Sequence, residues 1–390
     1  MIDDYLIYLL KTVGKFFINP LFYFLIFTAW FIGLMRIKRE RKQFSSKVAD
    51  FTVEFRTALV QGLLVSLALS IIFVGLGLVL DKSFFILLTY SVLIMCLTMK
   101  WKYLSPIFTI GTVLILSMAS VALNKFHNLN YLPRTFSEVQ FQEILVVLGI
   151  MLMAEAVLIL RNSWKNSSPT LISSKRGKTV GAHTMDKLWI LPIFFLIPGD
   201  IANEITKYWP VIPTSYTEIG IILFPFPVGF QMIAQGDIPK FVAKSYARKV
   251  ITISIICLIL AGASFYYPII SIGGIALVTI LYVYFSIKAR YDDSVKAPYF
   301  SYKNRGLVIL SVMKNSTADK MKLKVGEILV KVNGVEITSV KDLYEALNLN
   351  RAYVKLEVID EEGQIRLVNK AIYEEDHHEL GIIGVKNMAV

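Results

Sequence analysis

Long hydrophobic runs dominate the first 290 positions of the chain, and charged residues gather between them. A helix needs about 20 apolar residues to cross the hydrocarbon core of a bilayer. On this basis the pattern predicts about seven transmembrane helices, at 16–35, 58–80, 84–99, 107–123, 144–160, 250–267 and 269–287. The sequence therefore predicts a polytopic α-helical membrane domain over 16–290, preceded by a short N-terminal segment, 1–15.

Two further apolar stretches, 188–198 and 219–230, are too short to span a bilayer as helices. Together they contain four prolines, each of which lacks a backbone donor and breaks a helix. We expect re-entrant or interfacial elements here, within a cytoplasmic or interfacial insert over 162–249. Crossing by both stretches is the alternative, and it would leave the sidedness of all later segments unchanged.

Apolar residues also recur at helical spacing directly after the first long run, at Phe44, Val48, Phe51, Phe55 and Leu59. This spacing predicts an amphipathic helix that lies under the membrane or against the helical bundle. A surface for docking a partner protein is the alternative interpretation.

The pattern changes beyond a short polar linker, 291–298. Short β-branched runs predict strands at 307–312, 328–332, 354–359 and 365–370. Ser316 is suited to cap a short helix over 317–323, and Asn333-Gly334 favours a type I′ turn, in which both central residues need positive φ. Ser339 and Asp342 form a capping box ahead of a second helix, 340–347. These elements predict a small α+β domain over 299–390.

This order of elements, with the run KVGEILVKVNG at 324–334, resembles a bacterial PDZ domain. The resemblance implies a small, partly open β-barrel with two helices, which binds an extended peptide along a sheet edge beside a helix. The carboxylate-binding loop of the family is best matched by the run at 380–383, which implies the permuted strand order of many bacterial PDZ domains. Lys322 stands where the family usually has glycine, so a left-handed helix end there would carry strain.

The PDZ resemblance also implies a peptide groove between the last strand and the second helix. Its expected residues are Leu380, Gly381, Ile382 and Ile383 on the strand, and Leu343 and Leu347 on the helix. Two alternatives remain open from the pattern alone. The strand over 380–385 also fits an ordinary closing strand, and the two helical leucines also fit core positions.

Charge is distributed unevenly along the chain. The whole sequence has 41 Lys and Arg against 29 Asp and Glu, but the part from Tyr299 onward has 13 of each. A cluster of Arg36, Lys38, Arg39, Arg41 and Lys42 follows the first predicted span. Positive residues favour the cytoplasmic side, so we expect the N-terminus outside and the PDZ-like domain inside, near the bilayer. The cluster is expected to face anionic lipid rather than nucleic acid.

Catalytic motifs of membrane proteases are incomplete in this sequence. A zinc protease needs His-Glu-x-x-His, but the one His-Glu pair, His378-Glu379, has Ile382 at the second ligand position. An intramembrane serine protease needs a serine and a histidine at membrane depth, and Ser264 has no histidine in any predicted span. We therefore expect no enzyme activity, no catalytic or metal-binding residues and no cofactor.

A few isolated polar or sulfur residues could carry other chemistry. Glu155 lies in the middle of the fifth predicted span, where an acid is either functional or paired, here with Arg161. His377 and His378, among acidic residues, suit either a metal or an ordinary solvated turn. The only two cysteines both lie in predicted spans and imply no disulfide framework.

The chain as a whole resembles the MinJ family of cell-division topological determinants of Gram-positive rods. The resemblance rests on KFFINPLFY at 15–23, RIKRERK at 36–42 and the PDZ-like domain at the other end. It implies an adaptor at division septa and poles that bridges a DivIVA-type coiled-coil protein to the MinD ATPase and aids late division proteins. The alternative from another class is a PDZ-containing regulator of intramembrane proteolysis or a transporter-like protein.

Overall fold

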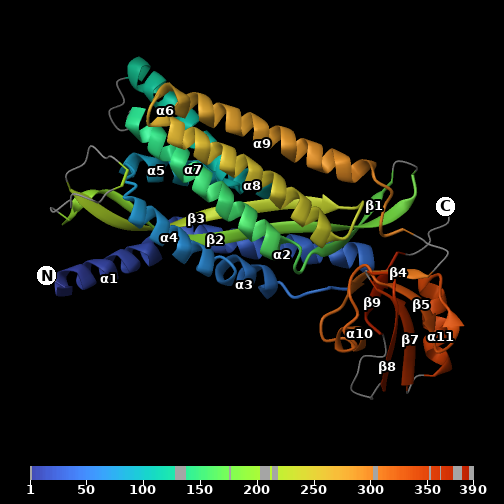
Figure 1. The fold of residues 1–390 in the computed structure, drawn as a ribbon. Coiled ribbons are helices and arrows are strands. Elements are labelled where there is room, and N and C mark those ends of the chain that lie inside the picture. The colour runs from blue at the N-terminus through green and yellow to red at the C-terminus, as the bar shows by residue number, and fades with distance from the viewer. Residues whose placement is uncertain are drawn as a thin grey trace.

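The computed structural model of the 390-residue chain describes residues 2–127, 138–174, 177–202, 211–212, 218–301, 306–350, 353–360, 362–371 and 380–385. Within these residues the chain forms a large helical domain and a small C-terminal domain with its own sheet. Figure 1 shows the C-terminal domain docked at one end of the helical domain, opposite the N-terminus.

The helical domain contains nine α-helices among its described residues: α1 (Ile2–Ile18), α2 (Pro20–Phe44), α3 (Thr52–Val60), α4 (Leu63–Leu76), α5 (Lys82–Leu97), α6 (Pro106–His127), α7 (Glu138–Leu158), α8 (Pro239–Ser264) and α9 (Ile269–Val295). Five helical stretches are long and apolar enough to cross a membrane, at Pro20–Phe44, Thr52–Leu76, Gln140–Ser163, Pro239–Ser264 and Ile269–Val295. Two shorter apolar helices, Lys82–Leu97 and Pro106–Ser120, fall on the remaining predicted spans. The polytopic membrane domain is thereby confirmed.

The first predicted span, 16–35, is displaced in the structure. Asn19 interrupts it, because its side chain accepts a hydrogen bond from the Leu21 amide and so caps a new helix, α2, with Pro20 in the first turn. The residues before this cap belong to a separate helix, α1. The expected short N-terminal segment is therefore helical, and the candidate span begins at the cap.

The predicted amphipathic helix from Phe44 to Leu59 is not continuous. Helix α2 ends at Phe44, Ser45 adopts a left-handed conformation with φ of 59°, and α3 begins only at Thr52. The connection between them is held by buried side chains of α2: Arg36 donates to two of its carbonyl groups, and Glu40 accepts from the Val48 amide. These bonds pair two carbonyl groups and one amide of the connection. In a continuous helix, the backbone would pair these groups internally.

The two proline-containing stretches form strands rather than re-entrant or interfacial elements. They belong to a three-stranded antiparallel sheet, β1 (Ser168–Ser173), β2 (Thr179–Ala202) and β3 (Ile219–Ala234), in that order. Helices α1 to α4 contact the long β2–β3 hairpin, and α9 contacts β3. Figure 1 shows the hairpin lying lengthwise through the helical domain, between α2 and the layer of α7, α8 and α9. Part of the predicted insert over 162–249 thus packs against the helices of the membrane domain as a β-hairpin.

Proline fits this hairpin because all four prolines occupy equivalent positions in the register. Pro192 faces Pro225, Pro227 faces Ile190, and Pro198 faces Ile219. Opposite residues of an antiparallel pair alternate between hydrogen-bonded and non-hydrogen-bonded pairs. Pro192 and Pro225 have no N–H groups to exchange, so theirs is a non-hydrogen-bonded pair. The other two pairs lie an even number of residues away along the strand and are therefore of the same type. The absent N–H groups therefore lie on the outer edges of the hairpin and not in its ladder.

The C-terminal domain matches the predicted order of elements. It contains β4 (Leu307–Val312), α10 (Thr317–Lys320), β5 (Ile328–Val332), β6 (Val335–Glu336), α11 (Val340–Leu349), β7 (Tyr353–Ile359), β8 (Ile365–Ala371) and β9 (Ile382–Gly384). The sheet order is β8-β7-β5-β4-β9, with β6 paired to β5, and β9 is antiparallel to β4. The last strand thus joins the first strand of the domain, as the permuted strand order requires.

Local turn and cap predictions in this domain are confirmed. Asn333 and Gly334 both have positive φ, and the capping box of Ser339 and Asp342 is complete. Hydrogen bonds from Ser339 and Thr338 lower the pKa of Asp342 to about 2. Lys322 has a φ of 57°, the left-handed conformation that glycine usually adopts at this place in the family.

Candidate functional site

A cavity of about 360 Å³ lies beside the last strand of the C-terminal domain, where the PDZ resemblance implies a peptide groove. The run from Gly381 to Gly384 forms one wall, and Val340 and Tyr344 of α11 form another. Strand β9 is the last in its sheet among the described residues, so a further strand can add at its outer edge. The geometry suits an extended peptide held between β9 and α11.

The structure divides the six predicted groove residues between the cavity and the core. Gly381, Ile382 and Ile383 line the cavity. Leu380 and Leu343 are buried in the domain core, and Leu347 packs against it. These three residues are absent from the lining of this cavity.

Helix α11 exposes a different pair of apolar residues to the groove from the one predicted. Val340 and Tyr344 lie four residues apart and line the cavity, although Val340 also packs against the core; Leu343 and Leu347 have the same spacing and contact the core alone. Spacing alone could not distinguish the two pairs. The larger leucine-rich face was the signal for the core, and the remaining apolar pair was the signal for the groove.

Gly381 is fixed by a close approach as well as by its backbone conformation. Its φ is +80°, and an added Cβ would lie 2.3 Å from Cβ of Ser316. The Gly381 carbonyl accepts from the Met313 amide, and the Leu380 carbonyl accepts from the Ala318 amide. Only glycine fits this loop, so a bulky substitution there would disrupt the domain itself and not only its groove.

The far wall of the groove comes from the membrane domain. The same cavity is lined by the end of α2 and the two residues that follow it, 43–46, and by Leu171 and Thr179 of the central sheet. A peptide in this groove would therefore contact both domains at once. This second wall was not predicted, because its residues lie more than 150 positions before those of α11 and β9 along the chain.

A small hydrophobic cluster fixes the two domains against each other. Its buried members are Phe300, Val308, Leu310, Ile383 and Val385, and Phe44, Val48 and Leu171 of the membrane domain pack against them. The Gly181 amide donates to the Phe300 carbonyl at 2.8 Å across the junction. The groove is thus held in a defined position relative to the membrane domain.

His183 is fully buried at this junction, at the end of β2 nearest the C-terminal domain. Its Nε2 lies 2.7 Å from the Leu310 carbonyl oxygen, and its Nδ1 lies 3.0 Å from Oγ of Ser167. Because a carbonyl can only accept, Nε2 carries the proton and Nδ1 accepts from the Ser167 hydroxyl. Burial lowers the pKa of His183 to about 4, so the ring is neutral at physiological pH.

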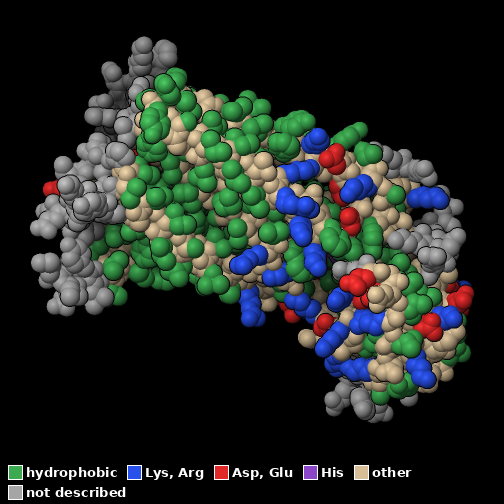
Figure 2. Space-filling model, in the orientation of Figure 1, with side chains coloured by type: hydrophobic (Ala, Val, Ile, Leu, Met, Phe, Trp, Pro, Cys, Tyr) green, Lys and Arg blue, Asp and Glu red, His purple; other side chains and the backbone are tan. Residues whose placement is uncertain are grey.

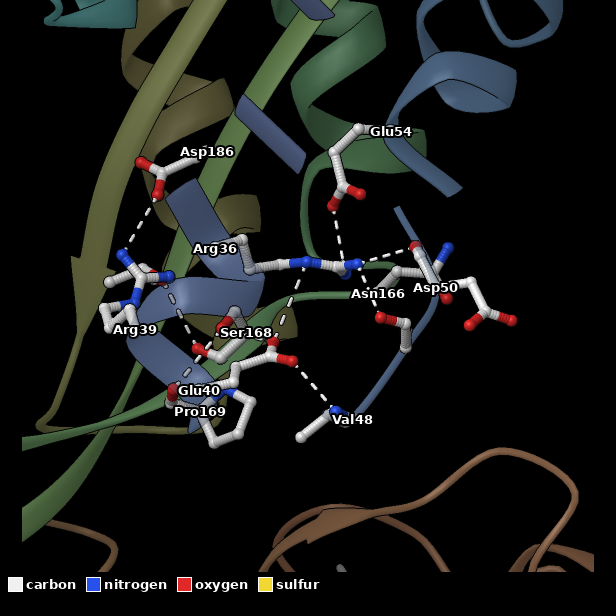
Figure 3. A network of polar contacts seen from close by, with 12 residues as sticks. Arg36, Arg39, Glu40, Val48, Asp50, Glu54, Asn166, Ser168, Pro169 and Asp186 are labelled. Carbon is white, nitrogen blue, oxygen red and sulfur yellow. Dashed lines mark hydrogen bonds and ion pairs between the residues drawn. The ribbon is translucent and has the colours of Figure 1, made fainter. Parts of the chain in front are cut away.

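The predicted basic cluster is split between the interior and the surface. Lys38, Arg41 and Lys42 are exposed, but Arg36 is only 5% exposed and Arg39 is half-buried. Arg36 lies 3.0 Å from Glu54 and 3.8 Å from Glu40, and it also donates to two backbone carbonyls, as Figure 3 shows. The helical periodicity of α2 turns Arg39 toward the central sheet and Arg36 toward α3 and the α2–α3 connection, away from the exposed members of the cluster.

Further ion pairs and hydrogen bonds tie this network to the central sheet. Glu40 accepts from Oγ of Ser168 at 2.8 Å, and Arg39 lies 3.4 Å from Asp186 and contacts Thr184 (Figure 3). The network therefore links α2, α3 and two strands at the end of the helical domain nearest the C-terminal domain. It fixes the part of α2 that forms the groove wall.

Glu155 is part of a buried polar cluster and does not pair with Arg161 as considered from the sequence. Its carboxylate accepts hydrogen bonds from Ser105 at 2.8 Å and from Tyr282 at 2.7 Å. The Tyr282 hydroxyl in turn lies 3.3 Å from the hydroxyl of Tyr246. The acid thus joins α7 to α9 and to the short turn before α6, which indicates a structural role.

Metal and thiol chemistry receive no support within the described ranges. No group of three or more His, Cys, Asp or Glu residues there could hold a metal ion. His377 and His378 lie outside the described residues. Cys96 and Cys257 are buried free thiols on α5 and α8.

Comparison with known proteins gives consistent results for the domain and for the whole chain. A family model described as "PDZ domain" matches residues 308–359. The chain is 33% identical over 381 residues to the cell division topological determinant MinJ of Bacillus subtilis (strain 168), covering 97% of this chain and 95% of that protein. A probable MinJ of Lacticaseibacillus paracasei is 29% identical over 80 residues, covering 20% of this chain and 22% of that protein. The chain therefore belongs to the MinJ family of cell division topological determinants.

Proposed function

We propose that this protein is a membrane-anchored adaptor in bacterial division-site selection. The observation that carries the proposal is its similarity, over 97% of its length, to a cell division topological determinant. A polytopic membrane domain with a docked PDZ domain suits this role, because it confines a binding module to the membrane surface. Confinement raises the effective concentration of two partners held at the same surface, so weak contacts suffice.

We further propose that the adaptor bridges a DivIVA-type scaffold at the septum and poles to the MinD ATPase, and that it aids assembly of late division proteins. Two separate surfaces support a bridge of this kind. One is the groove between β9 and α11, and the other is the exposed basic surface at the same end of the membrane domain. A strand edge, a groove and exposed positive charge can provide a binding role.

The PDZ domain is proposed to lie in the cytoplasm, with the protein concentrated at division septa and poles. Figure 2 shows hydrophobic side chains covering the part of the helical domain away from the PDZ domain, and Lys and Arg gathering next to it. Positive residues beside transmembrane helices favour the cytoplasmic side. This charge distribution supports the orientation.

Fluorescence imaging of a C-terminal fusion in the native host tests the cellular role. Foci at septa and poles that disperse when the DivIVA-type protein is deleted are expected. A uniform membrane signal in both strains would contradict the division-site role and leave a PDZ membrane protein of another function.

Partner capture by the groove needs variants that keep the domain folded. Tyr344→Ala and Val340→Ser reduce the groove wall on α11, whereas Gly381→Trp would collide with Ser316 and is unsuitable. Tyr353→Ala on β7 is the matched control, since Tyr353 is similarly exposed but does not line the cavity. A two-hybrid or pull-down assay with the DivIVA-type protein and MinD should show weaker binding of one partner only for the groove variants. Unchanged binding of both partners would rule out peptide capture at this groove.

A further inference from the structure

A second cleft, of about 430 Å³, lies between the membrane domain and the PDZ domain. Its membrane-domain wall is the turn after α7, from Trp164 to Ser167, together with the first residues of α8. Its PDZ wall includes the end of β4 and the residues Lys324 and Val325. The cleft is separate from the peptide groove, with which it shares only the adjoining α2–α3 connection.

The charges that line this cleft are unbalanced. Five basic and two acidic residues line it, and one of each, Arg36 and Glu40, pair with each other in the buried network. The remaining basic residues are Lys165, Lys240, Lys314 and Lys324, and they face a single acid, Asp319. No ion pair joins any of these four lysines to a carboxylate elsewhere in the described part of the chain. Among the residues that line the cleft, positive charge therefore exceeds negative charge, and both domains supply it.

The local structure of the membrane-domain wall strengthens this positive field. Lys165 and Lys240 each place Nζ 5.9 Å from the Trp164 ring, so the two ammonium groups flank one aromatic side chain. Helix α8 begins at Pro239 with no acidic residue in its first turn and no side-chain cap. The positive end of the dipole of this 26-residue helix thus adds to the charge of the lysines.

The location of the cleft favours a lipid over a soluble anion. Its lining residues come from both domains, and Figure 2 shows Lys and Arg gathering between the hydrophobic surface of the helical domain and the PDZ domain. Phe241, which follows Lys240, is 42% exposed, and its ring lies 5.9 Å from Nζ of that lysine. An apolar side chain beside an ammonium group suits the boundary between acyl chains and headgroups.

We propose that this cleft binds the phosphate headgroup of an anionic membrane lipid. Lys165 and Lys240 contact the phosphate from the membrane domain, and Lys314 and Lys324 contact it from the PDZ domain. The lipid thereby clamps the two domains together and fixes the orientation of the peptide groove. The site is distinct from the exposed lysines and arginine of α2, which do not line the cleft.

The test measures lipid retention by the purified full-length protein with native mass spectrometry. The protein is titrated with phosphatidylglycerol, with phosphatidylcholine as the zwitterionic lipid, and with glycerol 3-phosphate and inorganic phosphate as soluble anions. The cleft variant is Lys240→Gln/Lys324→Gln, one residue from each wall. The control is Lys288→Gln/Lys341→Gln, which removes one exposed lysine from each domain, outside both the cleft and the basic cluster of α2.

We expect selective retention of phosphatidylglycerol by the wild type and the control. The cleft variant should bind it roughly tenfold more weakly, because two charge-assisted contacts to phosphate are lost. A circular dichroism spectrum and an unfolding temperature like those of the control show that the cleft variant is folded. Equal retention by both variants, equal retention of the two lipids, or binding of soluble phosphate without phosphatidylglycerol would each overturn the lipid assignment.

Discussion

His183 is expected to make the stability of the folded protein depend on pH. In the folded state its pKa is lowered to about 4, below the ordinary value of about 6.5 that it has in the unfolded chain. The unfolded chain therefore binds the proton more readily, so the stabilisation is complete above about pH 6.5 and is lost as pH falls toward about 4. The full effect is roughly 3 kcal/mol at this one residue.

The expected result is a fall in unfolding temperature of the wild type between about pH 7 and about pH 5. Differential scanning fluorimetry in detergent measures it. His183→Gln retains an amide donor for the Leu310 carbonyl but cannot titrate, so this variant should lose a large part of the pH dependence. Parallel curves for the two proteins would show that another group controls the acid sensitivity.

Arg36 is expected to be the most sensitive residue of the buried ionic network. Replacing it with Met leaves Glu40 and Glu54 buried without their cation and also removes two hydrogen bonds to the α2–α3 connection. Breaking a buried pair in this way costs about 3–5 kcal/mol. Unfolding in a mild detergent should show a strongly lowered transition for Arg36→Met, whereas Lys38→Met, two residues away and exposed, should behave like the wild type.

Single residues were predictable where a local rule determined them. The capping box of Ser339 and Asp342 and the positive φ of Asn333 and Gly334 followed from short-range chemistry. The burial of Arg36 did not, because a dense basic run after a span is the ordinary signal for a membrane surface. Its carboxylate partner Glu54 lies on the next helix, so only the tertiary fold reveals the pair.

At the scale of elements, the sequence predicted the PDZ strands well and the central hairpin poorly. The strands of the PDZ domain are short and flanked by clear turn residues. Strand β2, in contrast, has 24 residues, far beyond the usual 5–6, and is buried along most of its length. A strand buried on both faces shows no alternation, so its apolar run cannot be distinguished from a short helical segment by periodicity.

The register of this hairpin gives a sharp test with two adjacent residues. Ile221 faces Leu196 in a non-hydrogen-bonded pair, like the pairs that contain the four native prolines. Ile222 faces Phe195 in a hydrogen-bonded pair. Both isoleucines are half-buried. Ile222→Pro should remove a ladder hydrogen bond and destabilise the protein by about 3 kcal/mol or more, while Ile221→Pro should cost considerably less. The unfolding temperatures and membrane yields of the two variants measure the difference. An equal fall in unfolding temperature for both variants would contradict the register of the hairpin.

At the scale of the whole molecule, the domain order was predictable but the docking was not. Composition and charge separated a membrane part from a neutral C-terminal domain at the polar linker. No periodicity encodes which faces of two domains meet, so the contribution of α2 to the groove wall was invisible in the sequence. The junction also gives Gly181 its role: an added Cβ would lie 2.8 Å from Leu310, 2.9 Å from Phe300 and 2.9 Å from Val385.

Gly181→Ala is therefore expected to loosen the PDZ domain from the membrane domain without unfolding either. Its methyl group would force apart three side chains that pack across the junction, and it would strain the hydrogen bond from the Gly181 amide to the Phe300 carbonyl. Hydrogen–deuterium exchange should become faster in β4 and β9, which line the junction, and stay unchanged in α7 and α8. Gly111→Ala in α6 is the matched control, because its added methyl group meets open space. If Gly181→Ala exchanged like this control, the packed junction would not be what holds the groove against the membrane domain.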